Sequence, residues 1–218
     1  MNYSEEIDLL DELLGLRQEK SAFLDERVQH SPTSIYIDPD RFAAEQATIF
    51  RSVPLAAAHI SELTEDGAFL RRTIADAPIL LTRDRNGDVH AFYNVCRHRG
   101  ARLVEAVGGC RHRFTCPYHA WTWDNTGRLI GVPHQDQGFP DLDKTAYGLK
   151  RVSVAVRHGW VWVQLDGDIN DDWFDGFEED MRALGMEDHA VFATEDKTWA
   201  ANWKIIGEGG LEAYHFRV

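Results

Sequence analysis

Residues 94–101 read NVCRHRGA, and residues 114–121 read FTCPYHAW. Each stretch contains one cysteine and one histidine, and 17 residues separate the first histidine from the second cysteine. The four residues are Cys96, His98, Cys116 and His119. Two thiolates and two imidazoles suit either one tetrahedral zinc ion or a two-iron cluster with two Cys on one iron and two His on the other. Zinc sites more often place two Cys on one knuckle and the His on a helix, a spacing that neither stretch follows.

Short apolar runs separated by turn signals surround these two stretches, from residue 53 to residue 166. Asn86-Gly87 lies between the runs 79–82 and 89–93, which predicts a β-hairpin. Turns are likewise predicted at residues 124–127 and at His158-Gly159, where the second turn joins the runs 152–156 and 160–163. Several short strands at such intervals predict an antiparallel β-sandwich or barrel.

Helical patterns flank this β region. Apolar residues recur at helical spacing over residues 4–18, with Ser4 as the predicted N-cap. Asp38-Pro39 predicts a helix through about residue 51, with Phe42, Ile49 and Phe50 facing inward. Residues 172–184 and the segment from residue 202 are also helical in pattern. The predicted class is therefore α+β: a helical segment over 1–37, the β domain over 38–166, and the start of an α+β domain over 167–218.

The composition narrows the classes of function. The 218 residues carry a formal charge of −13, which disfavours binding to nucleic acid or to anionic lipid. Much of that charge lies between residues 166 and 196, which hold 12 acidic residues and one arginine. Three cysteines are too few for a secreted disulfide framework, and no apolar run is long enough for a membrane span. We therefore expect a cytoplasmic protein that binds neither membranes nor nucleic acid.

The two Cys-His stretches closely resemble the Rieske domain of ring-hydroxylating oxygenases. The resemblance implies a [2Fe-2S] cluster in which the two cysteines bind one iron and the two histidines bind the other. Respiratory-chain Rieske proteins carry an additional disulfide between the cluster loops, but Ala101 and Tyr118 stand at the corresponding positions here. This difference indicates the oxygenase and ferredoxin kind. Cys110 is left without a partner, which predicts a buried or half-buried free thiol.

Residues 202–215, NWKIIGEGGLEAYH, resemble the segment that opens the mononuclear-iron site of the same oxygenases. The resemblance implies that His215 is the first ligand of a non-haem Fe(II). It also implies that Glu212 is a bridging carboxylate, which joins His215 to the second cluster histidine, His119, of a neighbouring subunit. This arrangement implies a homotrimer, with or without β subunits.

Two departures from the family pattern bear on the substrate. The bridge is usually Asp, and Glu is found in a minority of the family that attacks quaternary amines; Gly209 stands where the family often has Asn. The substrate class, an aromatic ring or a quaternary amine, therefore stays open. The remaining iron ligands are expected beyond Val218.

The resemblance predicts the α subunit of a Rieske mono- or dioxygenase. A reductase or ferredoxin delivers electrons to the cluster, and the mononuclear iron uses them to activate O2 and hydroxylate an organic substrate. The alternatives are a Rieske ferredoxin that only carries electrons and a zinc-stabilised binding module. Taken singly, Glu212 also suits a solvated helix position, and His215 suits a core histidine.

Five arginines between residues 97 and 113 surround the predicted cluster, with Glu105 as the one acidic residue among them. Positive charge there favours the reduced cluster and steers an acidic electron donor. Pairing of these arginines with acidic groups elsewhere is the equally weighted alternative.

Overall fold

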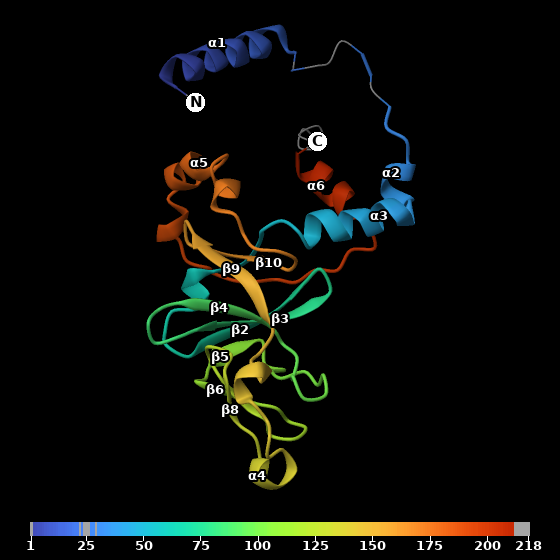
Figure 1. Cartoon of the computed structure of the whole chain (residues 1–218). Helices are drawn as coiled ribbons and strands as arrows, with labels where there is room; N and C mark the ends of the chain where they lie inside the picture. Colours follow the sequence, from blue (N-terminus) through green and yellow to red (C-terminus); the bar gives the residue numbers. More distant parts are fainter. Residues whose placement is uncertain (1, 22, 24–26, 29, 212–218) are drawn as a thin grey trace. The chain divides into compact units, whose positions relative to one another are not determined.

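The computed structural model describes residues 2–21, 23, 27–28 and 30–211 (Figure 1). Ten strands are described: β1 (Leu55–His59), β2 (Ala68–Ile74), β3 (Ala77–Arg83), β4 (Val89–Tyr93), β5 (Gly108–Cys110), β6 (Arg113–Thr115), β7 (Thr122–Asp124), β8 (Leu129–Gly131), β9 (Arg151–Arg157) and β10 (Trp160–Gln164). The α-helices are α1 (Tyr3–Glu19), α2 (Ser34–Ile37), α3 (Pro39–Glu45), α4 (Gln135–Gly138), α5 (Glu178–Ala183) and α6 (Trp203–Leu211). A π-helical turn, η1 (Gln46–Phe50), continues α3. The 3₁₀ turns are η2 (Ile60–Glu62), η3 (Lys144–Tyr147), η4 (Asp171–Phe174) and η5 (Met186–Asp188).

The chain divides into two units, Met1–Asp38 and Pro39–Val218. In the first unit, α1 covers the predicted helix, but its N-cap is Asn2 rather than Ser4. The Asn2 side chain accepts a hydrogen bond from the backbone N–H of Glu5, and the Glu5 carboxylate accepts one from the N–H of Asn2. The sequence signal for this capping box is an Asn followed three residues later by a Glu. No residue of α1 is buried.

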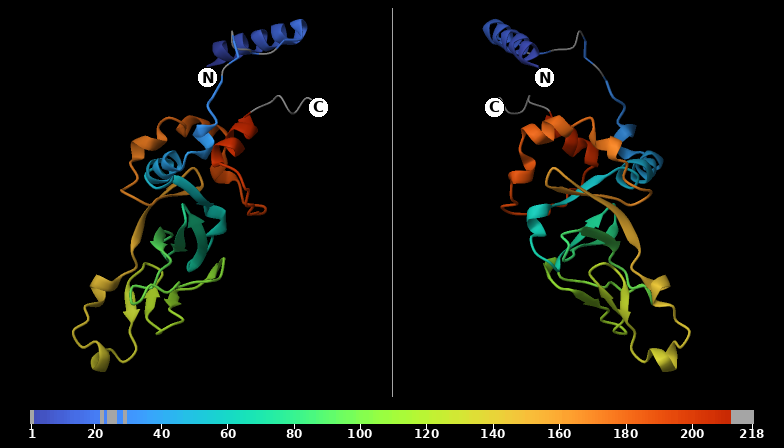
Figure 2. Two further views of the ribbon diagram at one scale, coloured as in Figure 1. Left: turned by 90° about the vertical axis from the view of Figure 1, so that its right-hand side faces the viewer. Right: turned by 60° about the vertical axis from the view of Figure 1, so that its left-hand side comes forward.

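Two antiparallel sheets form the β part of the second unit, which confirms the predicted fold class. The larger sheet has the order β1-β10-β9-β4-β3-β2-β5, and the smaller sheet has the order β6-β7-β8. The predicted hairpins β3-β4 and β9-β10 are present, and the turn predicted at residues 124–127 joins β7 to β8. Figure 2 shows the small sheet with α4 at one end of this unit and α3 and α6 at the other.

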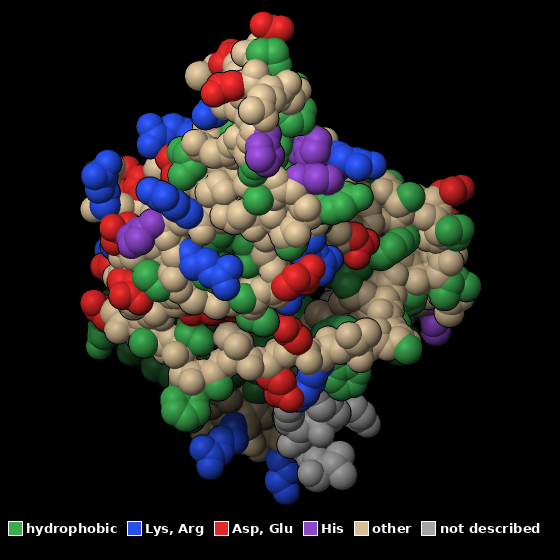
Figure 3. All heavy atoms as spheres, turned by 90° about the horizontal axis from the view of Figure 1, so that it is seen from below, with side chains coloured by type: hydrophobic (Ala, Val, Ile, Leu, Met, Phe, Trp, Pro, Cys, Tyr) green, Lys and Arg blue, Asp and Glu red, His purple; other side chains and the backbone are tan. Residues whose placement is uncertain are grey.

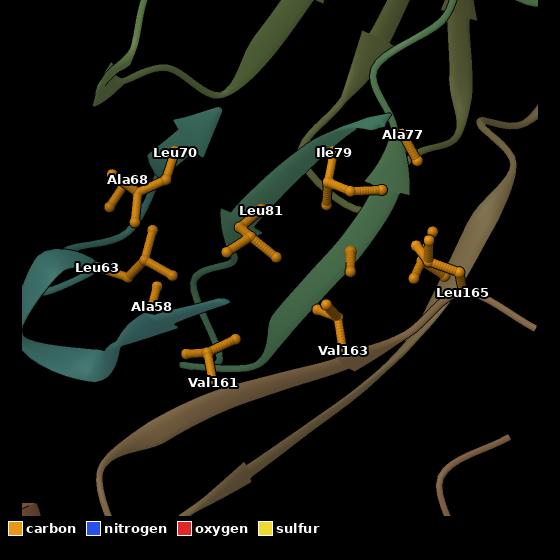
Figure 4. Packing of buried hydrophobic residues seen from close by; sticks show 12 residues of the cluster. Ala58, Leu63, Ala68, Leu70, Ala77, Ile79, Leu81, Val161, Val163 and Leu165 are labelled. Carbon is orange, nitrogen blue, oxygen red and sulfur yellow. The ribbon is translucent and has the colours of Figure 1, made fainter. Parts of the chain in front are cut away.

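The large sheet separates two hydrophobic cores, because successive side chains of a strand point to opposite faces. Ile79 and Leu81 of β3 belong to one core, where β10 curls over them and contributes Val161 and Val163 (Figure 4). Leu80, between them in sequence, belongs to the other core. That second core contains Phe69, Phe92, Phe114 and Trp123, together with the candidate ligands Cys96 and Cys116. The face of β2-β3-β4 therefore supports the small sheet.

A tight turn between β7 and β8 joins the small sheet to the large one. The Thr82 hydroxyl donates to the carbonyl oxygen of Asn125 at 2.6 Å, and the Asn125 side chain donates to the Arg83 carbonyl at 3.1 Å. Gly127 of this turn has a left-handed backbone, with φ +81°, and a Cβ there would lie 2.4 Å from the Phe92 ring. Only glycine lets the turn approach the sheet this closely.

The helical segments differ in part from expectation. The helix from Pro39 ends in the π-turn η1, and Phe42 and Ile49 are exposed at 43% and 37% instead of facing inward. The segment 172–184 is broken into η4 and α5. Within the part of the chain that the structure describes, no helix is both long and apolar enough to cross a membrane.

Gly127→Ala tests the joint between the sheets, with Gly87→Ala as its matched control. Both glycines lie in Asp-x-x-Gly turns, with φ +81° and +89°, and each alanine suffers about 1–2 kcal/mol of left-handed strain. At Gly87 the nearest neighbour is the flexible Arg83 side chain, whereas at Gly127 it is the buried Phe92 ring. Urea unfolding is expected to show a further loss of about 1–3 kcal/mol for Gly127→Ala alone. Equal losses for the two variants would contradict this role of Phe92.

Candidate metal centre

Two six-residue turns carry the four candidate ligands, and their backbones match. In the first loop, the N–H of Cys96 donates to the Ala101 carbonyl at 2.8 Å, and the N–H of Gly100 donates to the Cys96 carbonyl at 3.0 Å. In the second loop, the N–H of Cys116 donates to the carbonyl of Trp121 at 2.8 Å, and the N–H of Ala120 donates to the carbonyl of Cys116 at 3.0 Å. The two loops therefore have the same pattern of backbone hydrogen bonds.

The fifth residue of each turn has a left-handed backbone. It is Gly100, with φ +73°, in the first loop and Ala120, with φ +57°, in the second. The histidine occupies the third position of the first turn, as His98, and the fourth position of the second, as His119. The two cysteines thus occupy the same position of the common turn, whereas the two histidines differ by one position.

A buried asparagine fixes the first loop to the sheet. The Asn94 side chain donates to the Val104 carbonyl at 2.7 Å and accepts from the Val104 N–H at 2.9 Å. Asn94 is fully buried, so both of its polar atoms are satisfied within the protein. These two hydrogen bonds join the ends of the segment that contains Cys96 and His98.

The two candidate thiols lie inside the second core and adjoin each other. Cys96 and Cys116 are 3% and 2% exposed, and both are free. Burial raises the pKa of the Cys96 thiol, and the hydrogen-bonded Cys116 thiol raises it further. The backbone N–H groups of His98 and Arg99 point at the Cys96 sulfur and lower its pKa. Such amides stabilise a thiolate and any cluster bound to it.

The two candidate imidazoles form a second pair, closer to the surface. The ring centroids of His98 and His119 are 4.8 Å apart, with His98 half-buried and His119 exposed. The buried Trp121 ring stacks on His98 at 4.8 Å with an interplanar angle of 6°, and fixes the orientation of that imidazole. Burial lowers the pKa of His98, and the nearby His119 and Arg99 charges lower it further. A lowered pKa favours the neutral imidazole, which is the form that binds a metal.

The residues fit a Rieske [2Fe-2S] cluster. That group needs two thiolates on one iron and two imidazoles on the other, and the structure supplies the thiols as one pair and the imidazoles as another. Nδ1 of His98 is buried, and no described residue forms a hydrogen bond with it. An unsatisfied buried nitrogen beside a second imidazole is accounted for by a metal bond. Among the described residues, no three His, Cys, Asp or Glu side chains surround one point as a single ion requires.

The surface around this pair is basic and aromatic. Figure 3 looks onto this end and shows imidazoles beside Lys and Arg side chains. Arg102 pairs with Glu105 at 3.3 Å, whereas Arg99 lies over the exposed Tyr118 ring at 5.5 Å and Arg111 over Phe69 at 5.3 Å. Of the five arginines near the cluster loops, Arg102 is thus ion-paired, and Arg99 and Arg111 lie over aromatic rings.

Cys110 is exposed, contrary to the expectation of a buried or half-buried thiol. The reason is that β5, which ends at this residue, is an edge strand of the large sheet. The Cys110 thiol donates to the Asp66 carbonyl at 3.3 Å. It lies outside the pair formed by Cys96 and Cys116.

The second candidate site is described only in part. Glu212 and His215 lie outside the described residues. The preceding residues form α6, whose N-cap is Asn202: its side chain accepts from the N–H of Lys204 at 3.1 Å.

Sequence reasoning missed Glu45, a buried carboxylate that receives hydrogen bonds from Trp203 and Lys204. The i, i+4 spacing of Arg41 and Glu45 in the sequence is a signal for the ion pair between them. The long-range partners of Glu45 have no such signal, because no local pattern connects α3 with α6.

Comparison with known proteins places this geometry in a family. Residues 53–153 match the Rieske [2Fe-2S] domain. The chain is 33% identical to the anthranilate 1,2-dioxygenase large subunit of Acinetobacter baylyi over 83% of its length and 40% of the relative's. It is 36% identical to the glycine betaine monooxygenase oxygenase subunit of Chromohalobacter salexigens over 94% of its length and 46% of the relative's.

Solved structures agree with these matches. The carnitine-bound quaternary ammonium Rieske monooxygenase CntA superposes with a TM-score of 0.78 at 30% identity, over 84% of this chain and 53% of that one. Naphthalene 1,2-dioxygenase superposes with a TM-score of 0.58 at 32% identity, over 61% of this chain and 31% of that one. The chain spans about half the length of the curated relatives it matches, on their N-terminal side. It therefore belongs to the Rieske non-haem iron oxygenases, and it matches the N-terminal part of their α subunits.

Proposed function

We propose that this chain forms the electron-accepting part of an oxygenase α subunit, which hydroxylates an organic substrate at the expense of O2. The observation that carries the proposal is that the two loops place their thiols together in the core and their imidazoles together nearer the surface, in the same unit as α6. Family membership and the helix Trp203–Leu211 favour an oxygenase over a ferredoxin that only carries electrons. We further propose that residues 38–166 are the cluster domain and that residues 167–218 begin the catalytic domain.

We assign Cys96 and Cys116 to one iron, and His98 and His119 to the other. Burial of the thiol pair keeps water from that side, and stacking on Trp121 holds His98 in place. Because His119 is exposed, it is the cluster ligand through which an electron would pass toward a neighbouring subunit.

A reductase or ferredoxin supplies the electrons. The surface near the imidazoles carries the Arg99 guanidinium over the exposed Tyr118 ring. A basic and aromatic surface of this kind suits an acidic donor, because complementary charge speeds the encounter of two proteins.

Glu212 is assigned as the carboxylate that bridges His119 of a neighbouring subunit to His215, in a homotrimer in the cytoplasm. Oxygen activation is the chemistry that the mononuclear Fe(II) supplies when bound at His215. In this role the carboxylate of Glu212 would accept a hydrogen bond from the imidazole of His215 and orient it.

A quaternary ammonium compound is the substrate class we favour over an aromatic ring. The bridging position is Glu212 rather than Asp, a feature of the family members that attack quaternary amines. Glycine betaine monooxygenases match 94–99% of the chain, and the CntA structure superposes with a higher TM-score than naphthalene 1,2-dioxygenase does.

The cluster assignment predicts that Cys96→Ser and His98→Ala abolish the visible absorbance of the purified protein. Each variant removes a ligand that no other described cysteine or histidine of the loops replaces. The wild type is expected to contain two irons and two acid-labile sulfides per cluster. Cys110→Ser is the matched control and should keep the full spectrum, because Cys110 is exposed on β5. A colourless wild-type protein that contains zinc would contradict the assignment.

Glu212→Gln in the intact subunit tests the bridge. The cluster should reduce as in the wild type, while substrate-dependent turnover falls by about 10- to 100-fold, because the amide is a weaker acceptor for the imidazole N–H. Reduction is followed by visible spectroscopy and turnover by oxygen uptake. Turnover at the wild-type rate would reject the bridging role of Glu212.

Oxygen uptake by the intact subunit with its reductase tests the substrate class. We expect uptake with glycine betaine or carnitine and none above background with benzoate or naphthalene. Uptake with the aromatic compounds alone would overturn the choice of substrate. A cluster that cycles without any substrate-dependent uptake would instead support the ferredoxin alternative.

A further inference from the structure

Glu45, the last residue of α3, is a buried carboxylate remote in sequence from both metal sites. It is 8% exposed, and four donated hydrogen bonds reach its two oxygens. Lys204 Nζ lies 2.7 Å from each oxygen, Trp203 Nε1 lies 3.0 Å from Oε2, and Arg41 Nε lies 3.0 Å from Oε1. A buried carboxylate is tolerated only when it is paired and hydrogen-bonded in this way.

The Lys204 ammonium is the main cause that lowers the pKa of Glu45, to about 2, with Trp203 and Arg41 contributing in the same direction. The folded-state pKa lies below the ordinary value of 4.5, so the pairing stabilises the fold fully above that pH. The stabilisation is lost as the pH falls from about 4.5 toward 2. The ion pair is therefore intact throughout the neutral range.

The partners of Glu45 are the first two residues of α6. Trp203 also packs edge-to-face on Phe50, with ring centroids 5.2 Å apart. Phe50 ends the π-turn η1, which follows Glu45 directly, so α3 and η1 together contact one turn of α6. Figures 1 and 2 both show α6 beside α3. Within the Asn-Trp-Lys motif, Asn202 thus caps the helix, Trp203 packs against Phe50, and Lys204 forms the ion pair.

The rest of α6 is intrinsically weak. Three of its nine residues are glycines, at positions 207, 209 and 210, and glycine is the least favourable helix former after proline. A helix of this length is marginal in water without tertiary support. The orientation of α6 is consequently set where Glu45 and Phe50 hold its first turn.

We propose that Glu45 is a positioning residue for the mononuclear-iron segment: by holding Trp203 and Lys204 it sets the direction in which α6 delivers Glu212 and His215. This inference rests on the proposed roles of those two residues in the oxygenase. Trp203 and Leu211 are separated by a rise of about 12 Å along a helix, so a tilt of about 10° at the first turn moves the far end by about 2 Å. Displacements of that size are large for groups that must meet in a fixed geometry.

The test compares variants of the intact subunit in a single turnover. The cluster is reduced anaerobically with dithionite, O2 and substrate are added, and reoxidation of the cluster is followed by its visible spectrum. For Glu45→Gln and Lys204→Met we expect an unchanged spectrum, reduction potential and iron content, and reoxidation slowed by about tenfold or more.

Glu195→Gln is the matched control. It removes a carboxylate from the segment that leads into α6, where Glu195 pairs with Lys197 at 3.1 Å, but both side chains are exposed at 60% or more. We expect it to reoxidise at the wild-type rate. If Glu45→Gln does not fold, Trp203→Phe replaces it: the ring contact with Phe50 is kept, the hydrogen bond to Glu45 is lost, and slower reoxidation is again expected.

The outcomes separate this inference from the function on which it rests. Variants that reoxidise as fast as an active wild type would overturn the positioning role of Glu45. Variants that lose iron but keep the wild-type rate per bound iron would overturn it as well, since they indicate a role in iron retention. A wild-type protein whose cluster is not reoxidised in the presence of any substrate would instead overturn the proposed function.

Discussion

Placing two thiols side by side in a hydrophobic core is the constraint on which the rest of the second unit depends. Desolvation raises the cost of a thiolate at Cys96, and a neighbouring thiolate at Cys116 raises it again. A metal cluster offsets this cost, but only if the sulfurs are held at a fixed separation. Three features of the fold hold the sulfurs at this separation: the two matched turns, the hydrogen bonds between Asn94 and Val104, and the core beneath them. In that core, Phe114 and Trp123 belong to the same cluster as Phe69, Leu80 and Phe92 of the large sheet.

The same arrangement gives the site a direction. The thiols are enclosed by core residues, whereas His98 is half-buried and His119, in the loop between β6 and β7, is exposed. One side chain of the site thus faces outward while the opposite side is closed to water. In the proposed function, the donor docks near Arg99 and the electron passes on through His119, so both steps use the open, imidazole side of the site.

The sequence predicted those features that depend on local signals. Asn86-Gly87 and His158-Gly159 specify their hairpins because few other dipeptides adopt the required turns, and paired Cys-His stretches are rare by chance. The predictions that failed depended on long-range packing. Ile49 lies in the π-turn η1 rather than in a continued α-helix and is exposed, as is Phe42 on α3, and Cys110 is exposed because β5 is an edge strand. The role of Glu45 was beyond sequence reasoning, as its partners lie 158 and 159 residues away.

The contrast within α6 has a consequence for motion. A helix that is held by tertiary contacts at one end and contains poor helix formers at the other opens locally more often at the second end. In α6 the held end is the turn at Trp203 and Lys204, and the end rich in poor helix formers contains Gly207, Gly209 and Gly210. Local opening of this helix therefore costs most at the turn that is held beside α3 and least in the turns that contain the glycines.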